Sequence, residues 1–148
     1  LGLSQLARAS AMRDARRRVA RWYKSALADL VAGGTLEIPA DEDPAREDAW
    51  HLYVVRLNLG RWQFDRAQVI AALKEEGIGT AVHWMQLHLH PYYRETYGLG
   101  PGLFPVSEAE WPRLISLPIF PDMTEADVGE VAGAFTRLSQ RGGRPGAR

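Results

Sequence analysis

Three histidines stand close together in the middle of the chain, and imidazole is the side chain best suited to hydrogen bonding and proton transfer near neutral pH. His83 ends a stretch of strand-forming residues, and His88 and His90 follow in a segment without regular periodicity. Since the end of a strand and the loop after it commonly hold reacting groups in α/β proteins, we expect these histidines to face a substrate. Their number would formally allow a zinc site, but no cysteine joins them, and we expect no metal.

The motifs of a complete active site are missing from the sequence. Glycines 98, 100 and 102 do not form a phosphate-binding loop, because Pro101 stands among them and lacks the amide donor that such a loop requires. The acid pair Glu75 and Glu76 is typical of a helix surface rather than of a general acid and base. We therefore assign no catalytic residue to this chain.

An arginine-rich segment opens the chain and predicts one long amphipathic helix over residues 4–30, ended by Gly33 and Gly34. Its apolar stripe is Met12, Ala15, Val19, Trp22, Ala26 and Leu30, widened by Tyr23 and Leu27. At 1.5 Å per residue the helix would be about 40 Å long, about the diameter of a domain of this size, so we expect a strut between two bodies.

The basic side chains of this helix are Arg13, Arg16, Arg17, Arg18, Arg21 and Lys24. They do not indicate nucleic-acid binding, because Lys plus Arg and Asp plus Glu are equal at 18 each and leave no net positive charge. A solvated or interdomain face is the better interpretation.

The next part of the sequence predicts strand, helix and strand, the pattern of an α/β or α+β layer. Strands are expected at residues 36–39, 50–57 and 80–84, the second of them central because it is rich in β-branched and aromatic residues. An acidic, solvated loop at residues 41–48 separates the first two. The helix between the second and third strands begins at Asp65 and ends at Gly77, which suits a Schellman motif closed by Ile78.

Residues 85–105 have no steady period, and their many aromatic side chains favour an ordered functional loop or linker over disorder. Ser107 and Glu110 form the pattern of a capping box for a helix that Pro112 must keep short. Residues 116–121 are expected to be extended.

The last helix is expected to open at Thr124, with Asp127 three residues later as its capping partner. Its buried stripe is predicted to be Val128, Val131, Ala132, Phe135 and Leu138. The glycine- and arginine-rich tail, residues 141–148, is expected to be disordered.

The composition excludes several classes of protein. Hydrophobic residues make up 46% and charged residues 24%, which is the mix of an ordinary globular domain. No run approaches the roughly 18 apolar residues of a membrane span, and no signal peptide is visible. The absence of cysteine is compatible with the cytosol, so we predict a cytoplasmic protein without a membrane partner. Because the chain starts at Leu1 rather than Met, we expect a missing upstream segment.

Six short stretches, taken together, resemble a known family over residues 1–135. They are residues 1–6 before the arginine-rich helix, 49–53, 74–84, 87–93, 104–108 and 116–124. Their order and spacing are similar to the C-terminal portion of the DegT/DnrJ/StrS family of sugar aminotransferases that depend on pyridoxal phosphate (PLP).

This resemblance implies a fold-type-I aminotransferase, in which a large domain binds PLP and a small α+β domain closes over it. We accordingly divide the chain into an interdomain helix (1–34), a C-terminal small domain (35–140) and the tail (141–148), with a small, mainly antiparallel sheet and flanking helices. The resemblance also implies three partners: an N-terminal PLP-binding domain, a second subunit, and a nucleotide-linked keto sugar that receives an amino group from glutamate.

The resemblance implies that His83 lies at the edge of the active site and faces the sugar. His88, His51 and Tyr93 match family positions too, and we predict all four to bind substrate. In the family the lysine that holds PLP and the carboxylate beside the pyridine nitrogen belong to the large domain. Since neither Lys24 nor Lys74 has a fitting context here, we expect the chain alone to bind no cofactor and to be inactive.

Other functions stay open. A freestanding module that recognises a nucleotide sugar or an aminotransferase partner would have a start codon close to Leu1, whereas an aminotransferase would have a continuous upstream frame with a PLP lysine. Nucleic-acid binding through the arginine-rich helix ranks last and predicts a steep salt dependence of binding.

Within the family resemblance, residues 116–124 are similar to relatives that act on UDP-linked 4-keto sugars.

Overall fold

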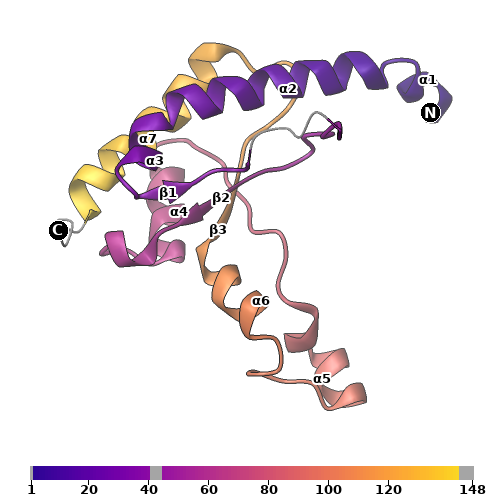
Figure 1. Cartoon of the computed structure of the whole chain (residues 1–148), viewed down its shortest axis with the longest axis vertical. Helices are drawn as coiled ribbons and strands as arrows, with labels where there is room; N and C mark the ends of the chain where they lie inside the picture. Colours follow the sequence, from indigo (N-terminus) through magenta and orange to yellow (C-terminus); the bar gives the residue numbers. More distant parts are fainter. Residues whose placement is uncertain (1, 41–44, 144–148) are drawn as a thin grey trace.

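A small antiparallel sheet forms the centre of the molecule in the computed structural model, which describes residues 2–40 and 45–143. Within these residues the sheet has three strands, β1 (Leu36–Glu37), β2 (Tyr53–Leu57) and β3 (Leu114–Leu117), in the order β1-β2-β3. Helices surround the sheet, and one segment, which contains α5 (Pro91–Tyr97) and α6 (Pro105–Glu110), projects away from it (Figure 1). The predicted α/β fold with a small antiparallel sheet and flanking helices is confirmed.

The central strand is β2, as the sequence predicts, although it begins three residues later than the expected segment. Alternate residues of β2 are buried, which is the period-two pattern of a strand with one face in the core. Val55 lies opposite Ile115 of β3, and Leu57 lies opposite Leu36 of β1.

The predicted strand at residues 80–84 is wrong. Only Ala81 pairs with the sheet, through hydrogen bonds from Ser116 N–H to Ala81 O (2.8 Å) and from Ala81 N–H to Ser116 O (3.1 Å). The place beside β2 is taken by β3, because consecutive buried side chains from Ile115 onward fill the core there. Trp84, by contrast, is 76% exposed and contributes nothing to the core.

The opening segment forms three helices, α1 (Gly2–Leu6), α2 (Ala9–Ala26) and α3 (Ala28–Ala32), so the prediction of one unbroken helix is wrong. The chain bends at Arg8 and Leu27, whose ψ angles are −3° and 2° instead of the roughly −42° of an α-helix. The bend at Leu27 lets both its fully buried side chain and Leu30 reach the core.

The predicted stripe is confirmed in its second half, where Val19 and Tyr23 of α2 are fully buried, and is wrong at Met12 and Ala26, because only the second half of this helix lies over the sheet. The first half of α2 and all of α1 extend beyond the body of the molecule (Figure 1). Leu3 and Leu6 of α1 are 86% and 69% exposed.

Helix α4 (Arg66–Glu75) is bounded as its sequence predicts. Asp65 accepts a hydrogen bond from the Gln68 N–H (2.8 Å), and the Gln68 side chain accepts one from the Asp65 N–H (2.9 Å), which completes a capping box. At the other end Gly77 has a φ of 81°, and the Ile78 N–H donates to Leu73 O at 2.9 Å. These contacts are the expected Schellman motif.

Helix α7 (Glu125–Gly142) confirms the predicted capping box of Thr124 and Asp127. All five residues of its predicted stripe are buried. The helix runs through Gly142, so the predicted disordered tail starts too early; residues 144–148 lie outside the described residues.

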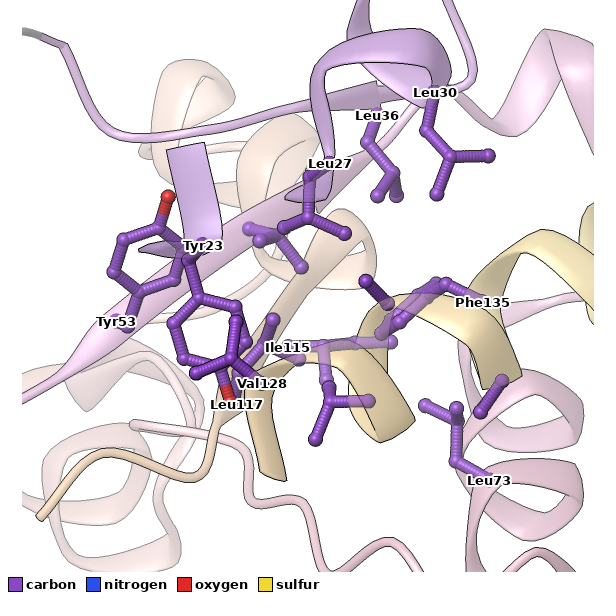
Figure 2. Packing of buried hydrophobic residues seen from close by; sticks show 14 of the residues in the cluster. Tyr23, Leu27, Leu30, Leu36, Tyr53, Leu73, Ile115, Leu117, Val128 and Phe135 are labelled. Atoms are coloured by element: carbon purple, nitrogen blue, oxygen red, sulfur yellow. The ribbon is translucent and has the colours of Figure 1, made fainter. Parts of the chain in front are cut away.

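The core lies between the sheet and the helices α2, α3, α4 and α7 (Figure 2). Tyr23 of α2 stacks on Tyr53 of β2 with ring centroids 4.7 Å apart, and Phe135 of α7 is fully buried. Helix α7 packs against both α2 and α4. The whole arrangement therefore holds the second half of α2 firmly over the central strand.

Residues 82–113, called the arm below, project from the sheet (Figure 1). They contain the 3₁₀ turns η2 (Leu87–Leu89) and η3 (Trp111–Arg113) and the helices α5 (Pro91–Tyr97) and α6 (Pro105–Glu110). The prediction of an irregular loop missed α5, whose signals were Pro91 in the first turn and Gly98, with a φ of 65°, after the last.

Helix α6 starts two residues before the predicted cap. Pro105 occupies its first turn, and Ser107 makes no capping hydrogen bond to any residue that the structure describes, so the predicted capping box of Ser107 and Glu110 is wrong. Pro112 lies in η3 directly after α6, and the helix is short as expected.

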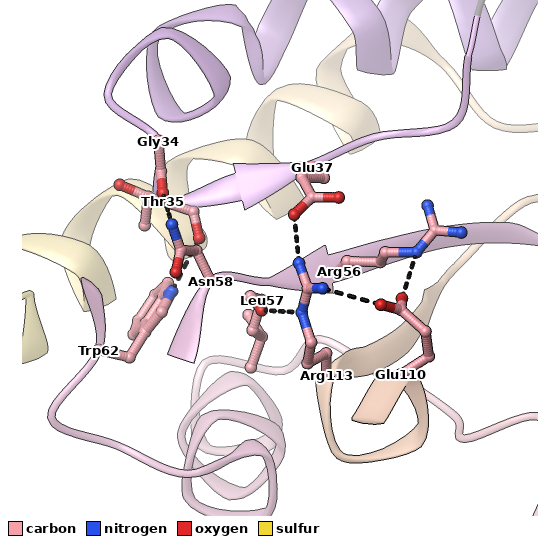
Figure 3. A network of polar contacts seen from close by, with 9 residues as sticks. All are labelled: Gly34, Thr35, Glu37, Arg56, Leu57, Asn58, Trp62, Glu110 and Arg113. Carbon is pink, nitrogen blue, oxygen red and sulfur yellow. Dashed lines mark hydrogen bonds and ion pairs between the residues drawn. The ribbon is translucent and has the colours of Figure 1, made fainter. Parts of the chain in front are cut away.

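A polar network fastens the base of the arm to the sheet (Figure 3). Arg113 donates to Leu57 O and to the Glu110 carboxylate, each at 2.9 Å, and it also pairs with Glu37 of β1. Arg56 of β2 pairs with the same Glu110 at 2.8 Å. One guanidinium therefore connects β1, β2 and the end of α6.

Of the predicted acidic loop, residues 41–44 lie outside the described residues, and residues 45–48 are exposed. Glu47 pairs with Arg13 of α2. Among the helices of the described residues, none combines the length and the apolar character required to cross a membrane.

Candidate functional site

The structure separates the four predicted substrate-binding residues into two pairs. His51 and His83 line a pocket of about 270 Å³ at the edge of the sheet, together with residues on either side of the Ala81–Ser116 bridge. His88 and Tyr93 line a second pocket of about 460 Å³ within the arm.

His83 is held at the first pocket by Ser116. Its Nδ1 lies 2.8 Å from Ser116 Oγ, and its ring makes an edge contact with Trp84, with centroids 4.7 Å apart. The other ring nitrogen, Nε2, has no hydrogen-bond partner among the described residues. His83 is half-buried, so it combines a fixed ring with a nitrogen available to a ligand.

Ser116 is a residue of the site that the sequence analysis missed. It is 4% exposed, lies in the middle of β3 between Ile115 and Leu117, and has both its backbone N–H and C=O bonded to Ala81. The available signal was a hydroxyl within a run of buried apolar residues, because a buried polar group needs a partner. His51 is exposed at the same pocket.

One hydrogen bond connects the pocket to a group of buried aromatic side chains. Tyr23 donates a hydrogen bond from its phenolic oxygen to the carbonyl of Pro118 (2.8 Å), and Pro118 lines the pocket. Tyr53 stacks between Tyr23 and Trp50, with its ring centroid 5.8 Å from that of Trp50. Burial raises the pKa of both tyrosines far above the usual value, so both phenols stay neutral and serve as fixed supports.

Thr80 also lines this pocket, and its Oγ1 is buried without a hydrogen-bond partner among the described residues. An unpaired buried hydroxyl is uncommon in a folded protein. Of the two pocket groups without a partner in the described part of the chain, His83 Nε2 and Thr80 Oγ1, the threonine hydroxyl is itself buried, so we assign ligand binding to the imidazole.

His88 is placed differently from His83. It is 5% exposed and donates from Nε2 to the Glu108 carboxylate at 3.0 Å, while its ring packs on Phe104. Glu108 also accepts hydrogen bonds from the backbone N–H groups of Gly102 (2.8 Å) and Phe104 (3.2 Å). The Gly102 amide, with the Phe104 amide and His88, lowers the pKa of Glu108. His88 therefore stabilises the structure of the arm through its contacts with Glu108 and Phe104.

Tyr93 and His90 also contact different parts of the arm. Tyr93 is half-buried and stacks on Tyr97, with centroids 6.0 Å apart. His90 donates from Nε2 to Met85 O at 3.2 Å. The three histidines therefore do not converge, and the part of the chain that the structure describes contains no cluster of three or more His, Asp or Glu side chains that could hold a metal ion.

Both lysines are exposed on helices, Lys24 on α2 and Lys74 on α4. Neither lines the pocket of His51 and His83. Lys24 lines a different pocket, of about 290 Å³, with Arg21 and Trp50. A lysine that acts as a nucleophile toward a carbonyl is commonly desolvated, and both of these side chains are exposed.

Comparisons with known proteins relate this geometry to a family. The model of the DegT/DnrJ/EryC1/StrS aminotransferase family matches residues 1–136. The chain is 39% identical over 138 residues to the uncharacterized protein MJ1066 of Methanocaldococcus jannaschii, covering 93% of this chain and 35% of that protein. It is 37% identical over 135 residues to the spore coat polysaccharide biosynthesis protein SpsC of Bacillus subtilis, covering 90% and 34%. The chain thus spans about a third of the length of the curated relatives it matches.

Solved protein structures are also similar to this chain. Spr1654 from Streptococcus pneumoniae, solved in its PLP-form, matches with a TM-score of 0.82 and 26% identity, covering 95% of this chain and 34% of that one. DesI, solved in the presence of its TDP-sugar product, matches with a TM-score of 0.80 and 25% identity over the same shares.

Proposed function

This chain belongs to the DegT/DnrJ/EryC1/StrS aminotransferase family, and from this premise we propose that it is the C-terminal part of a PLP-dependent aminotransferase. The substrate is a nucleotide-linked keto sugar and the amino donor is glutamate. The proposal rests on one observation above all: a half-buried histidine, fixed by Ser116, faces a pocket within the segment that the family model matches. The solved relatives in a PLP-form and with a TDP-sugar product support the cofactor and the substrate class.

The residues of this chain do not by themselves fit PLP. Lys24 and Lys74 are both exposed on helix surfaces, away from the His83 pocket, and neither has the environment of an activated nucleophile. We therefore derive no chemical step from this chain and place the cofactor in the remaining two-thirds of the protein. The role of the chain is to bind and orient the sugar.

His83 and His51 are the residues we propose for sugar binding. His83 offers an unpaired Nε2 from a ring that Ser116 holds in place, and the exposed His51 lies at the same pocket. A sugar carries many hydroxyl oxygens, and fixed imidazole groups are suitable partners for them. His88 and Tyr93 act indirectly in this proposal, because they belong to the separate pocket of the arm.

Two exposed apolar surfaces support the proposed partners. Leu3 and Leu6 on α1 would contact the N-terminal domain, for which the first half of α2 serves as the interdomain strut. The arm exposes Trp84, Leu87, Tyr92, Tyr97, Leu103 and Val106 and would contact the second subunit of a homodimer. We place the assembled enzyme in the cytoplasm.

The test compares the complete protein with the 148-residue chain. Each is mixed with PLP, glutamate and a TDP- or UDP-linked 4-keto sugar, and formation of the amino sugar is followed by mass spectrometry. We expect product from the complete protein and none from the chain. Turnover by the chain alone, or no transamination of any keto sugar by the complete protein, would contradict the proposal.

A second measurement tests cofactor binding directly. The 148-residue chain is incubated with PLP and then with borohydride, and its mass is determined. We expect no stoichiometric adduct on Lys24 or Lys74. A chain that begins at its own start codon and binds the nucleotide sugar without transamination would instead favour the freestanding binding module.

A further inference from the structure

The contact between His83 and Ser116 determines which ring nitrogen of His83 carries its proton. We propose that Ser116 donates its hydroxyl hydrogen to His83 Nδ1 and so keeps the neutral ring in the tautomer protonated at Nε2. His83 then presents a hydrogen-bond donor, and not a base, to an acceptor oxygen of the ligand. Ser116 is a positioning residue in this scheme, and the inference rests on the proposed function only in taking the ligand to be a sugar.

The geometry leaves the Ser116 hydroxyl a single partner. Ser116 is 4% exposed, and its Oγ lies 2.8 Å from His83 Nδ1, within the normal range of a hydrogen bond. Its backbone N–H and C=O are both bonded to Ala81, and it lies opposite Val54 in the sheet. His83 Nδ1 is the only acceptor that the described residues offer to this hydroxyl.

The hydrogen bond between Ser116 Oγ and His83 Nδ1 can have either atom as its donor. The two directions differ in which donor or lone pair is left without a partner. If Ser116 donates, its hydrogen is satisfied and only lone pairs of Oγ remain unused. If Nδ1–H donates instead, the serine hydrogen is left without an acceptor in a buried position. An unsatisfied buried donor is the more costly of the two, because a hydroxyl has one hydrogen but two lone pairs. The first assignment is therefore favoured.

This direction of the hydrogen bond determines what His83 Nε2 can offer to a ligand. A neutral imidazole carries one hydrogen, so an accepting Nδ1 leaves that hydrogen on Nε2. Nε2 has no partner among the residues described and belongs to a residue that lines the pocket. A donor at this position selects a hydroxyl, carbonyl or phosphate oxygen of the ligand, and it cannot accept a proton there while the ring is neutral.

The tautomer is tested by NMR on the 148-residue chain labelled with ¹⁵N-histidine, at a pH where the ring is neutral. His83→Gln assigns the His83 signals among those of the other histidines. We expect the Nδ1 shift of an unprotonated nitrogen and the Nε2 shift of a protonated one. A proton on Nδ1 in the wild-type chain would overturn the proposal.

Ser116→Ala and Ser116→Thr show whether the serine hydroxyl is the cause. We expect the His83 Nδ1 shift to move in Ser116→Ala and to return toward the wild-type value in Ser116→Thr, which keeps the hydroxyl and suits a strand. Unchanged His83 shifts in a Ser116→Ala chain whose amide spectrum shows it folded would also overturn the proposal. If that variant does not fold, the wild-type spectrum and Ser116→Thr still decide the question.

Kinetics of the complete protein separate this inference from the proposed function. Ser116→Ala should raise KM for the sugar roughly tenfold with a smaller change in kcat, and Ser116→Thr should recover most of the loss. A complete protein that transaminates no sugar would contradict the proposed function and leave the NMR result standing. An active enzyme with His83 protonated at Nδ1 would contradict this inference alone.

Discussion

The phenolic oxygen of Tyr23 donates a 2.8 Å hydrogen bond to the carbonyl of Pro118, and the two residues are 95 positions apart in the chain. Tyr23 lies on α2, whereas Pro118 directly follows β3 and lines the pocket of His83. This bond joins the opening helix to a residue that lines the candidate site.

Removing this bond should destabilise the fold. Tyr23→Phe keeps the ring and its stacking on Tyr53 but leaves the Pro118 carbonyl without its donor, so we expect the free energy of unfolding to fall by about 1 kcal/mol. Tyr53→Phe is the matched control, because the Tyr53 hydroxyl makes no hydrogen bond among the described residues. Urea unfolding measures both variants, and equal losses would argue against the role of the Tyr23–Pro118 bond.

Gly77 is expected to stabilise the end of α4 through its positive φ. Its φ of 81° is accessible to glycine but strained for alanine, so Gly77→Ala should lower the free energy of unfolding by about 1 kcal/mol. Gly129 lies inside α7, where an added methyl group would meet open space, and Gly129→Ala should raise stability by about 0.5 kcal/mol. Thermal unfolding compares the two, and opposite signs are the expected result.

Arg113 should control how firmly the arm is attached to the sheet. Arg113→Lys keeps the charge but loses the planar fork that reaches Leu57 O, Glu110 and Glu37 together, at a cost of about 1–2 kcal/mol. We expect faster amide hydrogen exchange in α6 and η3. Arg94→Lys on the exposed face of α5 is the control and should exchange like the wild type. Equal protection in both variants would show that the network does not hold the arm.

The packing of the arm should depend on pH through Glu108. Hydrogen bonds from the Gly102 amide, and then from the Phe104 amide and His88, lower the pKa of Glu108 in the folded chain. A carboxyl whose folded pKa is lowered stabilises the fold above its unfolded pKa, and this contribution disappears as the pH falls through the folded pKa. Protection of the Gly102 and Phe104 amides, corrected for intrinsic exchange, should therefore decrease in acid.

Glu108→Gln tests this assignment. The variant should exchange the Gly102 and Phe104 amides faster at neutral pH and should lose most of the acid dependence of their protection. Glu95→Gln removes a carboxylate from the exposed surface of α5 and should leave both properties as in the wild type. Acid dependence that persists in Glu108→Gln would assign the effect to another group.

His83 should affect the sugar and not the cofactor in the complete enzyme. In the proposed function His83→Ala removes one hydrogen bond to the sugar, so we expect kcat/KM for the sugar to fall roughly tenfold. The absorbance of bound PLP should stay unchanged. His90→Ala, which removes the histidine bonded to Met85 O within the arm, is the control. Loss of the PLP absorbance in His83→Ala would mean that His83 serves the cofactor or the fold.

The elements that the sequence predicted correctly have their determinants within a few residues. Asp65 and Gln68, Thr124 and Asp127, and Gly77 with Ile78 are neighbours along the chain, so their residue types alone mark where α4 and α7 begin or end. The predicted stripe of α7 is similarly local, because the helical repeat places those side chains on one face. Ser107 is the exception, since Pro105 two residues earlier starts α6 first.

The sequence by itself also determined the family resemblance and the central position of β2, since both depend on residue types in order along the chain. Only the tertiary structure decided that β3 and not residues 80–84 pairs beside β2, that Ala26 of the predicted stripe stays exposed, and that the histidines separate. His83 meets Ser116 33 residues away, and His88 meets Glu108 20 residues away. Such partners are selected by the packing of the whole sheet and its helices, because burial and hydrogen bonding depend on which distant segments come into contact.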